Sequence, residues 1–323
     1  MLPKQIFIRE VGVREGTQFE KKSIATSDKV KLLEMLSDCG YREIEAVSFV
    51  SPKAVPQMAD AEEVVSRMKQ KPGTVYTGLC LNRHGLIRAK ATGRVAIDGL
   101  LLLYSTDTFA RKNVNRSMAE IFDAIPDQVE LLRSFGIEKC VISVAAAFGC
   151  NYEGDVSQKH VVQIIDRAIS IVSDTGSGVR EILLGDSMGW GTPYAVKRLI
   201  ELVQNRWPDI PIRLHLHDTH GLGMANALAG LEMGVTRHDA AIGGLGGCPF
   251  SGSRGAAGNI VSEDLVHLCN EIGIETGIDF EKLLDTAREA ERIFGHELPG
   301  RNMRAGSLQS YRANARKGAS VGA

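Results

Sequence analysis

The sequence lacks a long hydrophobic run and has almost no net charge. In its 323 residues no apolar stretch approaches the roughly 18 to 20 residues of a membrane-spanning helix, and the N-terminus lacks the apolar core of a signal peptide. Lysine and arginine number 38 against 39 for aspartate and glutamate, a formal net charge of -1. No general field therefore attracts nucleic acid or an anionic membrane. We expect a cytoplasmic protein that binds neither of these and that holds any ligand through local groups.

The cysteines lack the paired spacing of a zinc site or a disulfide framework, so we expect reduced thiols. They are Cys39, Cys80, Cys140, Cys150, Cys248 and Cys269. All except Cys248 fall in apolar segments, which predicts core positions for these five. Two nucleotide-binding motifs are also missing, since no Gly-x-Gly-x-x-Gly follows the first expected strand and no Gly-x4-Gly-Lys-Ser/Thr occurs.

Short β-rich runs alternate with segments of 3.6-residue apolar spacing about eight times, a pattern typical of parallel βα units. The expected strands are 5–11, 41–48, 74–80, 95–104, 138–147, 180–186, 211–217 and 236–242. This repeat predicts an α/β protein with a (β/α)8 barrel, the TIM barrel fold. Two helix starts are also expected, with N-caps at Ser27 and at Thr192, the latter followed by Pro193.

The chain has no Pro/Ser-rich linker in its middle, so residues 1–299 are expected to form a single barrel domain. An extra helix over 280–294 follows the last βα unit. Residues 300–323 are rich in Gly, Ala, Ser and Arg, which predicts a flexible basic tail.

Polar residues gather after the expected strands, where barrel enzymes place their active sites. They are Arg14, Glu15, Glu45, Ser48, Asp186, His215, His217 and Cys248. The expected seventh strand alternates, because Arg213, His215 and His217 share one face and three aliphatic residues share the other. The apolar face must meet the helices, so both imidazoles turn inward, close enough to bind one cation. The alternative interpretation is a pair of ordinary polar barrel residues. Glu15 favours a mixed nitrogen and carboxylate metal site, whereas His220 is expected outside it.

A glycine-rich stretch follows the last expected strand, with seven glycines between residues 243 and 258. So many glycines exclude a helix or a strand. We expect a loop that closes over the site and carries the Cys248 thiol as an acid. A tight turn with an incidental cysteine is the alternative interpretation.

Five ordered motifs between about residues 6 and 275 resemble the 3-hydroxy-3-methylglutaryl-CoA lyase family of metal-dependent barrel lyases and condensing enzymes. The motifs are Val11–Gln18 (VGVREGTQ), Ser48–Asp60 (SFVSPKAVPQMAD), Leu184–Pro193 (LGDSMGWGTP), His215–Thr219 (HLHDT) and Gly246–Pro249 (GGCP). The resemblance implies a divalent ion, usually Mg or Mn, and an acyl-CoA substrate. It implies the metal ligands Glu15, His215, His217 and Asn259. It further implies substrate contacts by Arg14, Lys21 and Ser48, polar roles for Glu45, Asp186 and Glu263, and catalysis by Cys248.

The sequence departs from the lyase pattern at two places. The lyases have Arg-Asp-Gly-Leu-Gln-Asn at the first motif, whereas this chain has Arg14-Glu15-Gly16-Thr17-Gln18-Phe19, a spelling similar to homocitrate synthases. The glycine loop is also two residues longer, with Ser253 and Arg254 as the extra pair. Both departures leave the exact substrate open.

The resemblance implies a metal-dependent carbon–carbon lyase that splits 3-hydroxy-3-methylglutaryl-CoA into acetyl-CoA and acetoacetate by retro-Claisen chemistry. His215 or Asp186 would take the hydroxyl proton, Arg14 would stabilise the enolate, and Cys248 would protonate it. A related lyase acting on citramalyl-CoA, a homocitrate-synthase-like condensing enzyme and a non-catalytic acyl-CoA-binding barrel are the alternatives. The family resemblance also implies a homodimer.

Overall fold

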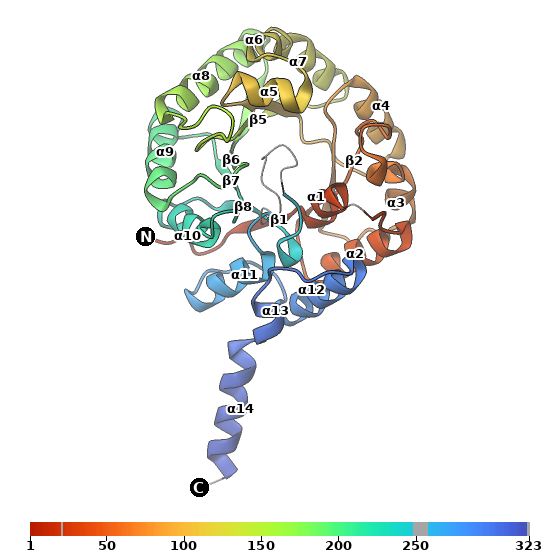
Figure 1. Cartoon of the computed structure of the whole chain (residues 1–323), viewed down its shortest axis with the longest axis vertical. Helices are drawn as coiled ribbons and strands as arrows, with labels where there is room; N and C mark the ends of the chain where they lie inside the picture. The colour runs from red at the N-terminus through yellow and green to blue at the C-terminus, as the bar shows by residue number, and fades with distance from the viewer. Residues whose placement is uncertain (21, 248–257, 322–323) are drawn as a thin grey trace.

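Eight parallel strands form one sheet that curls into a ring, with helices around its outer side (Figure 1). The computed structural model describes residues 1–20, 22–247 and 258–321, and side chains as far as residue 315. The strands are β1 (Phe7–Glu10), β2 (Glu43–Ser48), β3 (Val75–Leu79), β4 (Leu100–Tyr104), β5 (Lys139–Ala145), β6 (Gly178–Asp186), β7 (Ile212–Leu216) and β8 (Arg237–Ala240). The expected (β/α)8 barrel is therefore confirmed.

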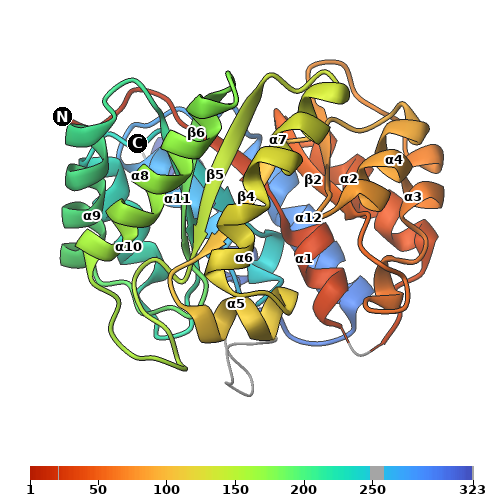
Figure 2. The same ribbon diagram turned by 90° about the horizontal axis from the view of Figure 1, so that it is seen from above.

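The helices follow the strands along the chain and surround the sheet in the side view of Figure 2. They are α1 (Gly12–Phe19), α2 (Thr26–Asp38), α3 (Ala61–Arg67), α4 (Arg83–Thr92), α5 (Asp107–Val114), α6 (Met118–Asp123), α7 (Ile125–Ser134), α8 (Gln158–Asp174), α9 (Pro193–Arg206), α10 (Gly223–Glu232), α11 (Ser262–Glu271), α12 (Phe280–Phe294), α13 (Asn302–Ala305) and α14 (Leu308–Val321), with short 3-10 turns η1 (Pro56–Met58) and η2 (Ile242–Gly244). The expected helix 280–294 matches α12.

The hydrogen-bonded strand order is β3-β2-β1-β8-β7-β6-β5-β4, so β3 and β4 are the two ends of the sheet. The ring closes just before β4, where the Ala96 amide donates to the Tyr76 carbonyl (2.8 Å) and the Gly78 amide donates to the Ala96 carbonyl (3.3 Å). Beyond Ala96 the described chain pairs β3 with β2 and β4 with β5, but not with each other. The barrel therefore has a seam between β3 and β4. The expected strand 95–104 is correspondingly shorter, since its first residues pair with β3 instead.

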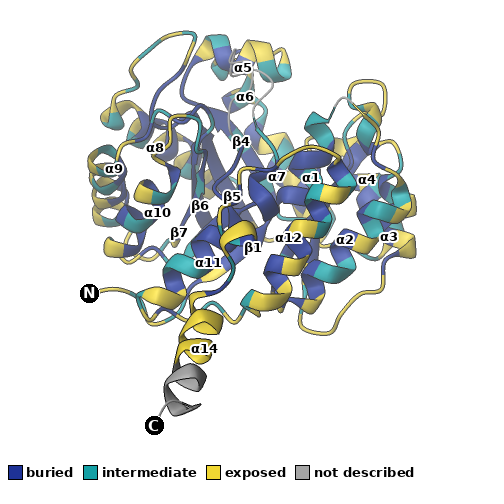
Figure 3. Cartoon of the chain, turned by 60° about the horizontal axis from the view of Figure 1, so that its bottom comes forward, coloured by how far each residue is buried: buried dark blue, intermediate teal, exposed yellow. Residues whose placement is uncertain are grey.

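Helix packing follows the apolar spacing of the sequence. In α8 the buried residues Val161, Ile164, Ile165, Ala168 and Val172 form one stripe toward the sheet. Figure 3 shows the same division around the barrel, with buried residues on the sheet and exposed ones on the outer helix faces. The five described cysteines are buried, as expected.

The two expected N-caps have different outcomes. Thr192 caps α9, because its side chain accepts a hydrogen bond from the Ala195 amide (3.2 Å) and Pro193 occupies the first turn. The Ser27 expectation is wrong, since α2 begins at Thr26 and Ala25 precedes it without a side-chain cap. The sequence expectation relied only on the start of the apolar pattern, and it placed the N-cap of α2 two residues too late.

The C-terminal segment contains helices α13 and α14, and α14 projects away from the barrel (Figure 1). The start of the segment is docked, because Met303 is buried and the Asn302 amide donates to Asp264 (3.0 Å). The expected flexibility of 300–323 stays a prediction. Among the described residues no helix is both long enough and apolar enough to span a membrane.

Candidate active site

The first helix places two of the expected site residues beside the barrel axis. Strand β1 ends at Glu10 and α1 begins at Gly12, so Arg14 and Glu15 stand at the C-terminal end of the strand. Glu10 fixes this junction by accepting hydrogen bonds from the Gly12 amide (2.7 Å) and the Ile242 amide (2.9 Å). Because Glu10 binds both amides, it fixes the start of α1 relative to the segment that follows β8.

Glu15, His215 and His217 come together at this end of the barrel. Each offers one ligand atom, and these atoms all lie within 4.8 Å of one another. The Nε2 atoms of the two histidines are 3.1 Å apart, and Nε2 of His215 is 3.7 Å from Oε1 of Glu15. The strand alternation predicted from the sequence is therefore confirmed, since both imidazoles turn inward.

Charge and burial put Glu15 and His217 in protonation states suited to a cation, whereas Glu15 and the hydrogen bond to Asp239 outweigh burial and raise the pKa of His215. Burial alone would raise the pKa of Glu15, but Arg14 and the histidines lower it to about 2. Burial, with a smaller effect of His215, lowers the pKa of His217 to about 4. Near neutral pH, Glu15 is thus an anion and His217 has a free nitrogen lone pair, as metal ligands require.

Asn259 completes the cluster from a segment that pairs with the end of β7. Residues His217 and Asn259 form an antiparallel bridge. The side-chain amide of Asn259 donates to Oε2 of Glu15 (2.5 Å) and to the Leu245 carbonyl (3.1 Å). Its buried Oδ1 atom has no hydrogen-bond partner. Asn259 thus contacts Glu15 through its amide nitrogen and keeps a buried oxygen without a partner, and such an oxygen can serve as a further ligand for a divalent cation.

Asp239 holds His215 from behind. Its Oδ2 atom accepts a hydrogen bond from Nδ1 of His215 (3.0 Å), which leaves Nε2 facing Glu15 and His217. Asp239 also receives two parallel hydrogen bonds from Arg9, at 2.9 Å and 2.7 Å. This bidentate pairing fixes the carboxylate, and the carboxylate in turn fixes the imidazole orientation.

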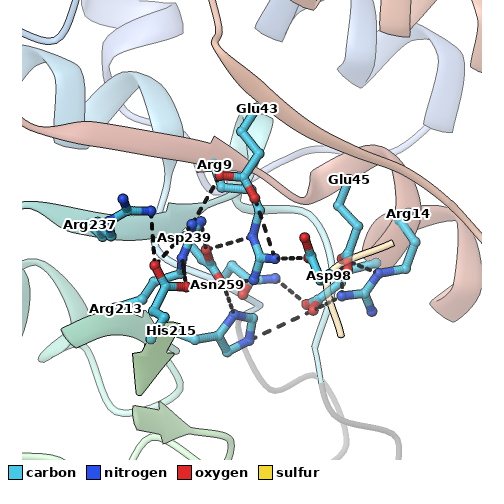
Figure 4. A network of polar contacts seen from close by, with 12 residues as sticks. Arg9, Arg14, Glu43, Glu45, Asp98, Arg213, His215, Arg237, Asp239 and Asn259 are labelled. Atoms are coloured by element: carbon cyan, nitrogen blue, oxygen red, sulfur yellow. Dashed lines mark hydrogen bonds and ion pairs between the residues drawn. The ribbon is translucent and has the colours of Figure 1, made fainter. Parts of the chain in front are cut away.

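Below this pair the barrel interior contains a buried network of opposite charges (Figure 4). Arg213 donates to Glu181 (2.8 Å), to Glu43 (3.0 Å) and to Asp239 (3.2 Å). Arg9 also donates to Asp98 (2.8 Å). These groups join several strands beneath the histidines.

Arg14 and Glu45 face each other across the site. Two Arg14 nitrogens contact the Glu45 carboxylate, and Nη2 also donates to Glu15 (2.8 Å). Burial raises the pKa of Glu45, and Arg14 opposes that shift only in part. The two carboxylates thus hold a permanently charged guanidinium beside the histidines.

Two further expected site residues, Asp186 and Ser48, are both fully buried. Asp186 is fully buried between Gly185 and Ser187, and its Oδ2 atom accepts from the Gly191 amide (2.9 Å). Its Oδ1 atom has no partner, and burial raises its pKa to about 6. Ser48 is fully buried outside the cavity wall described below.

Glu263 lies away from the two histidines. Its carboxylate accepts from the Gly243 amide (3.0 Å), and burial raises its pKa to about 8. It therefore supports the stem of the glycine loop.

A cavity of about 240 Å³ opens beside these groups. The charged residues and histidines in its wall are Arg9, Arg14, Glu15, Glu45, Asp98, His215, His217 and Asp239. Gly247, at the stem of the glycine loop, also lines it. Gly246 has φ 97°, and a Cβ there would lie 2.8 Å from the Cβ of Glu15, so a glycine is needed for this approach. Lys21, Cys248, Ser253 and Arg254 lie outside the described residues.

Sequence reasoning missed three residues of this wall, namely Arg9, Asp98 and Asp239. Asp239 was detectable, because it pairs in register with His215 on the neighbouring parallel strand. Residues paired across parallel strands point to the same face. Asp98 precedes β4 and carries no comparable signal.

Known proteins resemble this chain in both sequence and fold. The HMGL-like family model matches residues 5–289. Human mitochondrial hydroxymethylglutaryl-CoA lyase is 39% identical over 284 residues, which cover 88% of this chain and 84% of that protein. The mouse cytoplasmic 3-hydroxy-3-methylglutaryl-CoA lyase is 37% identical over 286 residues, covering 88% of this chain and 80% of that protein.

Solved structures of bacterial lyases resemble this chain in fold. An HMG-CoA lyase from Acinetobacter baumannii, in complex with coenzyme A and 3-methylmalate, has a TM-score of 0.84 and 36% identity and covers 94% of this chain and 96% of its own. Hydroxymethylglutaryl-CoA lyase from Pseudomonas aeruginosa also has a TM-score of 0.84, with 35% identity, and covers 94% of this chain and 98% of its own. The chain therefore belongs to the hydroxymethylglutaryl-CoA lyase-like family of enzymes, as its five ordered motifs predicted.

Proposed function

We propose that this enzyme cleaves 3-hydroxy-3-methylglutaryl-CoA to acetyl-CoA and acetoacetate in a divalent-metal-dependent retro-Claisen reaction. The observation that carries the proposal is that Glu15, His215 and His217 gather beside Arg14 in one cavity, with Asn259 in contact with Glu15. The family membership and the coenzyme A complex of the Acinetobacter relative support an acyl-CoA substrate.

The cluster fits a cation such as Mg or Mn. Glu15, His215, His217 and Asn259 would hold it, the last through its unpartnered Oδ1 atom. A bound divalent ion supplies Lewis-acid chemistry, which lowers the pKa of the substrate hydroxyl group and orients it.

Asp186 is the residue to which we assign the hydroxyl proton. His215 was the other candidate, but its Nδ1 is bonded to Asp239 and its Nε2 faces the cation ligands. One nitrogen cannot act as a ligand and a base at the same time. Asp186 has a free buried oxygen and a pKa raised to about 6, and it lies between two cavity-lining residues. A general base can accept a proton from such a position through one water molecule.

Arg14 stabilises the negative charge that develops on the thioester oxygen when the C2–C3 bond breaks. Its guanidinium is already held by Glu45 and Glu15, so it needs little reorganisation during the reaction. A preorganised contact of this type contributes about 3 to 4 kcal/mol to transition-state stabilisation.

Cys248 donates the proton that converts the enolate to acetyl-CoA. The support is the sequence motif and the position of Gly247, the preceding residue, on the cavity wall. The glycine loop, when closed, excludes water from the enolate. Lys21 keeps its expected role as a substrate contact, whereas Ser48, fully buried outside the cavity wall, is assigned none. Glu263 supports the loop stem.

The test is release of acetyl-CoA, followed by mass spectrometry, from 3-hydroxy-3-methylglutaryl-CoA with Mg or Mn and with a chelator. Metal-dependent cleavage is the expected result. Citramalyl-CoA is assayed in parallel, because the spelling of the first motif leaves the acyl group open. Turnover of citramalyl-CoA alone would overturn the proposed substrate, and no turnover of either thioester would favour the condensing alternative.

Two further expectations stay predictions. The homodimer is tested by sedimentation of the purified chain. The cytoplasmic location is tested by fractionation of cells, and the relatives do not decide it because their names include both mitochondrial and cytoplasmic lyases.

A further inference from the structure

A second cavity opens at the N-terminal ends of the strands, opposite the candidate active site. Its volume is about 660 Å³, which lies within the range of small-molecule sites. Phe7, Val75 and Lys139 are the first residues of β1, β3 and β5, and all three line it. None of the described residues of the candidate metal site lines it. We call this cavity the lower mouth.

The charge network of the barrel interior separates the lower mouth from the active-site cavity (Figure 4). Asp98 lines both cavities, and its two carboxylate oxygens have different partners. Oδ2 accepts from Arg9 (2.8 Å), whereas Oδ1 accepts from Arg180 (3.2 Å), which lines the lower mouth alone. Glu43, in the wall of the lower mouth, is held by Arg213 (3.0 Å). The lower mouth is therefore distinct from the catalytic cavity.

Two basic side chains of the lower mouth have no carboxylate partner among the residues that the structure describes. The Lys139 side chain makes neither a hydrogen bond nor an ion pair there, and its stem lies along Gly178, where a Cβ would be 3.5 Å from Cγ of Lys139. The guanidinium of Arg42 stands over the ring of Phe7, 5.3 Å from the centroid. Both groups therefore keep their hydrogen-bond donors for a ligand.

Other donors in this wall are only partly used. Arg180 binds the Asp98 side chain through Nη2, and Arg237 binds Glu181 through Nη1 (3.0 Å), so each guanidinium keeps further N–H groups. The hydroxyl oxygen of Thr77 is buried and has no partner, whereas buried polar groups are normally paired. The wall thus offers one neutral donor in addition to its cations.

The carboxylates of the same wall are largely occupied. Asp98 and Glu43 already receive hydrogen bonds from arginines. Glu138, which is exposed, is the one wall carboxylate that has no partner within the described chain. Free donors therefore outnumber free acceptors. This balance suits a ligand that has acceptor oxygens and a negative charge, as a carboxylate does.

Apolar side chains form the rest of the wall. Phe7 and Val75 are 40% and 49% exposed, although the inward residues of a (β/α)8 barrel normally pack in filled layers. The other apolar side chains of the wall are Ile8, Ile97, Ile137 and Ile278. Exposed apolar surface beside free cations fits a ligand with an alkyl body and an anionic end.

We propose that the lower mouth is a second binding site of this enzyme, selective for short aliphatic carboxylates. The carboxylate lies against Lys139 and Arg180, which belong to the neighbouring strands β5 and β6. The alkyl chain lies against Ile97, Ile137 and Val75. Binding at this site requires neither a metal ion nor a thioester, so it is independent of the proposed reaction.

The first experiment titrates the full-length chain with hexanoate and follows the ligand by NMR. Hexylammonium has the opposite charge, and inorganic phosphate lacks the alkyl body, so these two ions are the comparison probes. We expect one hexanoate per chain with a Kd of about 1 mM, and at least tenfold weaker binding of both comparison ions. The absence of saturable hexanoate binding, or equal binding of either comparison ion, overturns the proposal.

The second experiment alters the wall. Val75→Asp places a negative charge in the lower mouth, and we expect at least tenfold weaker hexanoate binding. Ile87→Asp is the matched control, because Ile87 of α4 is also 49% exposed and lines neither cavity. Lys139→Met removes one cation and should weaken binding about tenfold, whereas Lys159→Met, on α8, should not. Unchanged affinity in either folded mouth variant, or an equal loss in its control, overturns the proposal.

A third measurement tests whether hexanoate lies in the active-site cavity instead. The hexanoate titration is repeated in the presence of saturating 3-methylglutaryl-CoA, which lacks the hydroxyl group needed for cleavage. We expect the Kd of hexanoate to remain unchanged. Displacement of hexanoate by this thioester assigns it to the active-site cavity and overturns the proposal.

Discussion

Replacing Asp239 by Asn tests whether the charge network orients the candidate metal ligands. Asp239 is fully buried, and it is the partner of Nδ1 of His215. An asparagine keeps the shape but presents either an amide nitrogen or a neutral oxygen to that imidazole. We expect the ring to lose its fixed orientation and the enzyme to lose affinity for Mn.

The magnitude follows from the contacts. Removal of a carboxylate that orients a ligating histidine typically costs about 10- to 100-fold in metal affinity, or about 1.4 to 2.7 kcal/mol. Asp239→Asn also leaves Arg9 and Arg213 without a full counter-charge. Breaking such a buried pair costs about 3 to 5 kcal/mol of folding stability. The loss of affinity must therefore be separated from the loss of stability.

Glu181→Gln provides the matched control. Glu181 is 2% exposed, pairs with Arg213 (2.8 Å) and Arg237 (3.0 Å), and has no contact with His215. Urea unfolding should show a comparable loss of stability in both variants. Titration calorimetry with Mn should show weaker binding only in Asp239→Asn. Equal Mn affinity in that variant and the wild type, or an equal loss in both variants, would refute the positioning argument.

Three other perturbations test separate parts of the site. Asp186→Asn should lower kcat by about 10²- to 10⁴-fold and remove the fall in rate of the wild type below pH 6, since burial raises the pKa of Asp186 to about 6; a pH–rate profile that keeps this fall contradicts the assignment. Cys248→Ser should abolish acetyl-CoA release but leave thioester binding by calorimetry intact, and normal turnover would exclude the thiol as proton donor. Burial raises the pKa of Glu263 from 4.5 to about 8, so the folded state binds a proton that the unfolded state releases, and stability falls as pH rises through that window. Glu263→Gln should lose this component of the fall between pH 6 and 8.5 in urea unfolding, and an unchanged slope would contradict it.

The barrel was predictable because its repeating unit is short and locally encoded. Alternating patterns such as Ile212 to Leu216 specify both a strand and the face that meets the helices. The seam was not predictable in this way. Residues 95–97 are apolar like β4, and the pairing of Ala96 with β3 separates them from it. Pairing between strands depends on tertiary geometry that no local pattern contains.

Three residues of the candidate metal site were also predictable from local sequence patterns. Both histidines follow from alternation on one strand, and Glu15 follows from its place after β1. Asn259 came from the family resemblance alone, because it lies in an irregular segment whose position depends on the bridge to His217. The depth of Asp186 behind the wall also depends on how the turn after β6 folds back through the Gly191 amide.

The seam gives this barrel the mechanics of a split ring. In a closed barrel, a change in diameter requires every strand to shift against its neighbours. Here the facing edges of β3 and β4 can separate above Ala96 without the loss of a ladder hydrogen bond. Substitutions in α4 and α7, the helices behind that gap, can therefore widen or narrow the interior while the strands that carry the histidines and Arg9 keep their register.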